Sequence, residues 1–202
     1  MPTSTEAIQA VEILKDEQIA APIDVVFETL LEQLGPLNTT PDGTSLAMRL
    51  EAWPGGRWFR DLGNNTGHFW GHVQAIKPPV LLEICGPLFM SYAAISNVQY
   101  RLSEENGVTL LKFAHRAIGQ IPPEHQENMG KGWSAILNRI QQAAERRGKQ
   151  GINTKTVTPA GSKRKGKPAV SYLHFRSILQ VAGRHRKRRN RHVTRRNSIG
   201  RI

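Results

Sequence analysis

The sequence contains very little cysteine and no long hydrophobic run. Cys85 is the only cysteine among 202 residues, which excludes an internal disulfide and any zinc or iron–sulfur site built from several cysteines. No apolar stretch approaches the roughly 18 residues of a membrane span, and the N-terminal residues lack the basic start and apolar core of a signal peptide. We therefore expect a soluble, cytoplasmic protein with no membrane span.

Acidic residues are missing from the last quarter of the chain. Residues 151–202 contain 15 lysines and arginines and no aspartate or glutamate, whereas residues 1–150 contain 13 basic residues and all 16 acidic ones. This break in composition predicts two parts, a globular domain over residues 1–148 and a basic tail over residues 149–202. We expect the tail to be disordered, apart from a short helix over 170–183, because it has too few apolar residues to form a core.

Three interpretations of the tail stay open. Its basic runs within residues 163–196 could contact nucleic acid or an anionic surface non-specifically, since lysine and arginine neutralise phosphates without reading base sequence. The tail could also be a solvated appendage. Finally, it could be a functionless extension translated out of frame or past a lost stop codon.

The first 148 residues have an α+β pattern. Apolar and polar residues alternate loosely over 8–19, which predicts a strand, and apolar residues at helical spacing predict a helix from Pro22 to Leu34. Short alternating runs separated by Gly, Pro or Asn then predict about six antiparallel strands. These runs lie at residues 46–51, 57–62, 68–76, 80–85, 96–102 and 108–117. A long amphipathic helix follows Pro122, so we expect helices packed on one face of a sheet.

Five short motifs resemble the SRPBCC superfamily, which includes START domains and birch-pollen-allergen-like proteins. The motifs lie at residues 21–27, 54–58, 71–73, 78–79 and 132–133. In particular, the sequence resembles bacterial proteins similar to the C-terminal domain of the activator of heat shock protein 90 ATPase, over about residues 8–147. The resemblance implies the helix-grip fold, a curved antiparallel sheet of about six or seven strands around a long C-terminal helix, with an apolar cavity between them.

The resemblance implies functions of three different classes. The first is binding of a hydrophobic small molecule between the sheet and the C-terminal helix, without a chemical step. The second is regulation of a chaperone ATPase of the heat shock protein 90 type, and the third is catalysis of the cyclase or dehydratase kind. Gly-x-Ser-x-Gly, His-Glu-x-x-His and phosphate-binding motifs are missing from the sequence, which favours binding over catalysis. We name no catalytic residue and no cofactor.

Six residues are candidates for the lining of the cavity. They are Tyr100, Leu111, Phe113 and His115 on predicted strands, and Met129 and Trp133 on the terminal helix. Strand alternation and helical spacing place all six on apolar faces. The polar groups of His115 and Tyr100 could orient a ligand. The alternative for each is an ordinary core residue with a single hydrogen bond, and packing is the default role of Met129 and Trp133.

Two histidines, His68 and His72, have the spacing of a metal site only if they lie on a helix. In a regular strand they would share a face but lie about 13 Å apart, too far for one metal ion. We therefore interpret residues 54–73 as two strands with a turn, and expect no metal site there. Three carboxylates also lie on predicted strands, and alternation does not show whether any two converge. They are Glu51, Asp61 and Glu83.

Overall fold

The computed structural model describes residues 7–40, 42–88 and 93–155, which form seven strands and two helices. The strands are β1 (Gln9–Ile19), β2 (Met48–Leu50), β3 (Arg57–Gly63), β4 (Thr66–Lys77), β5 (Leu81–Gly86), β6 (Ala94–Glu105) and β7 (Val108–Gly119). The helices are α1 (Ile23–Leu34) and α2 (Pro123–Lys155). The predicted strands and helices are all present in this part of the chain.

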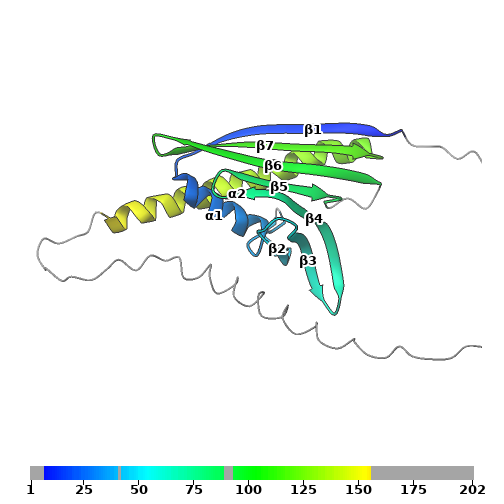
Figure 1. Cartoon of the computed structure of the whole chain (residues 1–202), viewed down its shortest axis with the longest axis horizontal. Coiled ribbons are helices and arrows are strands. Elements are labelled where there is room, and N and C mark those ends of the chain that lie inside the picture. The colour runs from blue at the N-terminus through cyan, green and yellow to red at the C-terminus, as the bar shows by residue number, and fades with distance from the viewer. Residues whose placement is uncertain (1–6, 41, 89–92, 156–202) are drawn as a thin grey trace, which may run out of the picture. The chain divides into compact units, whose positions relative to one another are not determined.

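The seven strands form one antiparallel sheet in the order β1-β7-β6-β5-β4-β3-β2. Both helices lie on the same side of this sheet, and the hairpin of β3 and β4 bends towards that side (Figure 1). A curved antiparallel sheet around a long C-terminal helix is the helix-grip fold, so the predicted fold class is confirmed. The core lies between the sheet and the helices.

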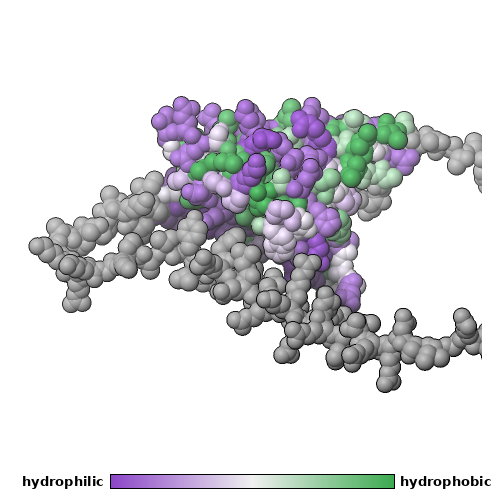
Figure 2. Space-filling view, viewed as in Figure 1, coloured by the Kyte–Doolittle hydropathy of each residue, from purple (hydrophilic) through white to green (hydrophobic). Residues whose placement is uncertain are grey.

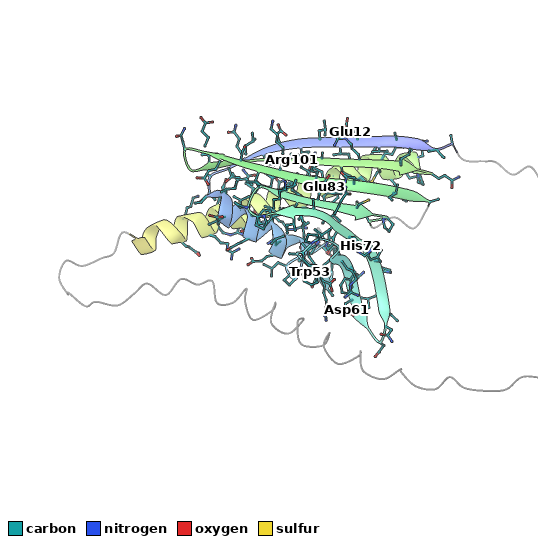
Figure 3. The ribbon with its side chains drawn as sticks, in the orientation of Figure 1. Glu12, Trp53, Asp61, His72, Glu83 and Arg101 are labelled. Atoms are coloured by element: carbon teal, nitrogen blue, oxygen red, sulfur yellow. The ribbon has the colours of Figure 1, made fainter. Side chains whose placement is uncertain are left out.

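The inward face of the sheet is most regular on β6 and β7, where buried and exposed residues alternate. The outward face is largely polar. Arg116 pairs with Glu12 at 2.7 Å, and Gln99 donates a 3.0 Å hydrogen bond to Glu83. Figure 3 shows Glu12, Glu83 and Arg101 distributed along the sheet, and Figure 2 shows polar surface over much of it with hydrophobic patches between.

Helix α1 is fixed at both ends by other elements. The carboxylate of Glu104 on β6 accepts a 2.6 Å hydrogen bond from the backbone N–H of Ile23, which satisfies one of the free donors of the first turn. At the other end, Nε1 of Trp58 on β3 donates a buried 2.7 Å hydrogen bond to the carbonyl of Leu34. Gly35 follows and ends the helix, as the sequence predicts.

Helix α2 buries one face against the sheet. The buried side chains are Met129, Trp133, Leu137, Ile140 and Ala144, the face that helical spacing predicts. Further along, Arg147 donates to both carboxylate oxygens of Glu32 on α1, at 2.7 and 3.1 Å. Residue 148, the predicted domain boundary, falls within this helix. The tail's predicted disorder, the short helix at 170–183 and the segment 163–196 lie outside the described residues.

Asparagine and glycine form the hairpin turns that the sequence predicts. Asn64 and Asn65, between β3 and β4, have φ angles of 50° and 59°. Asn106 and Gly107, between β6 and β7, have φ angles of 53° and 78°. These left-handed conformations are those that Asn and Gly adopt most readily. Among the described residues, no helix is both long and apolar enough to cross a membrane.

Candidate functional site

The candidate site lies on the inward face of β6 and β7, beneath α2. The register pairs Val98 with His115 and Tyr100 with Phe113. Because side chains in a strand alternate between faces, His115 points into the interior together with Phe113 and Tyr100. Ser96, two residues before Val98, lies on the same face.

Four of the six predicted residues form a continuous cluster of rings. The centroids of Tyr100 and Phe113 are 5.1 Å apart, and those of Phe113 and Trp133 are 4.7 Å apart. Trp133 also contacts the His115 ring edge-on, at 5.6 Å. These separations are typical of favourable aromatic pairs. The structure therefore brings together strand residues and a helix residue that the sequence could only place on separate faces.

The other two predicted residues are buried beside this cluster. Leu111 precedes Phe113 by two positions on the same face of β7, and Met129 lies one helical turn before Trp133 on α2. All six candidates are at most 3% exposed. Their burial fits both packing and ligand contact, so their role as a cavity lining stays a prediction.

His115 is held by a hydrogen bond from the helix. Nε1 of Trp133 donates to Nδ1 of His115 at 2.9 Å, and both side chains are buried. An indole N–H can only donate, so Nδ1 must be the unprotonated nitrogen. The proton of the neutral imidazole is therefore on Nε2. Burial lowers the pKa of His115 to about 4, which keeps the ring neutral at pH 7.

Three polar atoms on this face have no hydrogen-bond partner among the described residues. They are Ser96 Oγ, Tyr100 Oη and His115 Nε2. In the β6–β7 register, Ser96 and Tyr100 are the two diagonal neighbours of His115, and each is about 7–8 Å from it on the same face. Ser96 and Tyr100 are about 13 Å from each other, because they are four residues apart on β6. Burial also raises the pKa of Tyr100 above its usual range, so its hydroxyl keeps its proton.

Unpartnered buried polar atoms are uncommon in folded proteins, because each one loses its hydrogen bonds to water. Three of them on one face need partners from outside the described residues, either a ligand or ordered water. Sequence reasoning identified His115 and Tyr100 as candidates and overlooked Ser96. The sequence pattern could have identified Ser96, since this serine lies at an inward position of a strand whose other inward residues are mainly apolar.

The prediction that His68 and His72 share a face of their strand was wrong. A β-bulge at Trp70 places Trp58 opposite Gly71 and the next residue, Phe59, opposite Phe69. The extra residue reverses the alternation, so His72 shares its face with Phe69, 4.7 Å away, and no longer with His68. Within the described ranges, no group of three or more His, Cys, Asp and Glu side chains has the arrangement of a metal site.

The three candidate carboxylates have different partners. Glu51 accepts hydrogen bonds from the side chain of Arg57, which lowers the pKa of the carboxyl. Asp61 pairs with Arg49 at 3.0 Å, and Glu83 accepts from Gln99. Figure 3 shows Asp61 on the β3–β4 hairpin and Glu83 on the main part of the sheet. This arrangement provides no support for a paired acid–base site.

The family model for Activator of Hsp90 ATPase homolog 1-like proteins matches residues 20–145. This range contains both helices' packed faces, most of the sheet and all of the candidate site. Among curated proteins, none matches the chain.

Solved structures share the fold at low sequence identity. An uncharacterized protein from Rhizobium leguminosarum has a TM-score of 0.55 and 16% identity, over 69% of this chain and 97% of its own. The di-domain ARO/CYC protein StfQ of the steffimycin biosynthetic pathway has a TM-score of 0.51 and 12% identity, over 71% of this chain and 52% of its own. At these identities the similarity shows the fold alone.

Proposed function

The chain belongs to the Activator of Hsp90 ATPase homolog 1-like family of the SRPBCC superfamily, and from this premise we propose that it binds a hydrophobic small molecule between its sheet and α2. The single observation that carries the proposal is the set of three unpartnered polar atoms on the inward face of β6 and β7. A ligand with an apolar body would contact Phe113 and Trp133 and offer its polar group to these atoms.

Two experiments test this proposal. Native mass spectrometry of the protein purified from cells is expected to show a bound small molecule that denaturation releases. Uptake of Nile red, an uncharged hydrophobic dye, tests the same interior in solution. A protein that is consistently free of ligand and takes up no dye would contradict the proposal.

A pair of variants on β6 localises the binding. Ser96→Leu places a larger side chain on the inward face beside His115 and is expected to reduce Nile red binding. Ser103→Leu makes the same change on the same strand, at an outward and exposed position, and is expected to leave binding unchanged. Equal effects of the two variants would show that the dye binds elsewhere.

Regulation of a chaperone ATPase is the second candidate function, and the family's description favours it. An ATPase assay of the heat shock protein 90 of the same organism, with and without this protein, is the test. An unchanged rate would remove this candidate. A cytoplasmic location, which the single Cys85 favours, and contact of residues 163–196 with nucleic acid stay predictions.

A further inference from the structure

The hydrogen-bond donors of the candidate site define which ligands it can accept. Trp133 occupies Nδ1 of His115, so the neutral ring presents Nε2–H as a donor and has no acceptor left. The hydroxyls of Tyr100 and Ser96 each add one donor. All three groups lie on one face of two neighbouring strands. The site therefore offers up to three donors, and Nε2–H can be satisfied only by an acceptor.

The same site is unfavourable for a charged ligand. His115 cannot take up a second proton at Nδ1 without losing the hydrogen bond from Trp133, so it does not readily supply a positive charge. Neither hydroxyl carries a charge. A carboxylate in this buried position would lose its hydration without gaining an ion pair from these three residues.

We propose that His115, together with one of its two diagonal neighbours Ser96 and Tyr100, recognises a carbonyl oxygen on an uncharged, mainly apolar molecule, such as a ketone, quinone or ester. A carbonyl oxygen has two lone pairs and no proton, so it matches the donors that the site presents. The rings of Phe113 and Trp133 provide the adjoining apolar surface. This inference rests on the proposed function, because it specifies the ligand of the same interior site.

Three probes of nearly equal shape separate the possible ligand classes. They are 2-acetylnaphthalene, a ketone, 2-ethylnaphthalene, a hydrocarbon, and 2-naphthoate, an anion. The ketone is expected to bind the full-length protein about tenfold or more tighter than the hydrocarbon, because only the ketone satisfies the buried donors. The anion is expected to bind more weakly than either. Fluorescence titration measures all three affinities.

Variants then assign the preference to the named residues. In at least one of Tyr100→Phe and Ser96→Ala, affinity for the ketone is expected to fall towards that of the hydrocarbon, while hydrocarbon affinity stays the same or rises. His115→Phe is expected to have the largest effect. If this variant does not fold, the imidazole ¹⁵N spectrum of the unmodified protein replaces it, and the His115 Nε2 signal is expected to shift with the ketone and not with the hydrocarbon.

The outcomes distinguish this inference from the function on which it rests. Equal affinity for ketone and hydrocarbon, or tighter binding of the anion, would overturn the carbonyl assignment while the binding function stands. A ketone preference that persists unchanged in all the variants would place the carbonyl elsewhere and also overturn the assignment. Failure of all three probes to bind, together with ligand-free native mass spectra, would contradict the function and the inference together.

Discussion

The indole of Trp133 on α2 donates a 2.9 Å hydrogen bond to Nδ1 of His115 on β7, and this bond fixes which nitrogen of the buried imidazole carries the proton. It connects the long helix to the sheet at the centre of the candidate site. The bond also leaves Nε2–H directed away from Trp133 with no partner among the described residues. The availability of this donor for a ligand therefore depends on a residue that belongs to another element.

Replacement of Trp133 by Phe removes the hydrogen bond that fixes the tautomer of His115. Without the indole donor, the neutral His115 ring can carry its proton on either nitrogen, and the imidazole ¹⁵N spectrum should change from one tautomer to a mixture. Trp53→Phe is the control, since Trp53 is 49% exposed and the variant should leave the His115 signals unchanged. A single, unaltered tautomer in Trp133→Phe would show that another group fixes the proton.

Acid is expected to destabilise the fold through His115. Burial lowers the pKa of this residue from 6.5 to about 4 in the folded protein, so between these two values the unfolded chain binds more protons than the folded one. The contribution of the neutral His115 to the free energy of unfolding is fully present above pH 6.5 and decreases as the pH falls towards 4. The decrease attributable to this residue is on the order of 3 kcal/mol.

Urea denaturation at a series of pH values measures this dependence. His115→Phe is expected to flatten the profile between pH 6.5 and 4. His68→Gln, which removes an exposed imidazole, is the control and is expected to retain the profile of the unmodified protein. The same slope in His115→Phe as in the unmodified protein would contradict the assignment to His115.

Removal of the buried hydroxyl of Tyr100 and removal of that of Thr109 are expected to affect stability differently in the absence of ligand. Tyr100→Phe removes an unpartnered hydroxyl and is expected to leave the free energy of unfolding unchanged or to raise it by about 1 kcal/mol. Thr109→Val removes a buried hydroxyl that donates 2.7 Å to the carbonyl of Ala21, and is expected to lower it by about 1–3 kcal/mol. Comparable losses in the two variants would mean that the Tyr100 hydroxyl has a partner.

Two glycines within the three residues before Trp133, Gly130 and Gly132, lower the stability of the first half of α2. A Cβ atom at Gly130 or Gly132 would meet no heavy atom within 4 Å beyond its chain neighbours and the backbone of its own helix, so Ala at either position should stabilise the helix by about 0.5–1 kcal/mol. Gly148 in the same helix is the control, because a Cβ there would lie 3.2 Å from Cβ of Ala21 and the gain should be smaller. Thermal unfolding measures the three variants, and a loss of stability in Gly130→Ala and Gly132→Ala would contradict this prediction.

The sequence predicted the faces of the elements better than the contacts between them. Alternation along β6 and β7 placed Tyr100 and His115 in the interior, because this regular pair contains no bulge. The hydrogen bond between Trp133 and His115 could not be predicted, since it depends on how α2 lies over the sheet. The prediction that His68 and His72 share a face was wrong because one extra residue at Trp70 reverses the alternation between them, and nothing in the local pattern marks it.

The central claim is that the interior beside Ser96, Tyr100 and His115 holds an apolar ligand. A crystal structure of the full-length protein with 2-acetylnaphthalene tests it most directly. We expect the ketone between β6, β7 and α2, with its oxygen within hydrogen-bond distance of His115 Nε2 and of at least one of the two hydroxyls. An interior filled by side chains or ordered water, with the three polar atoms bonded there and the probe absent, would contradict the account.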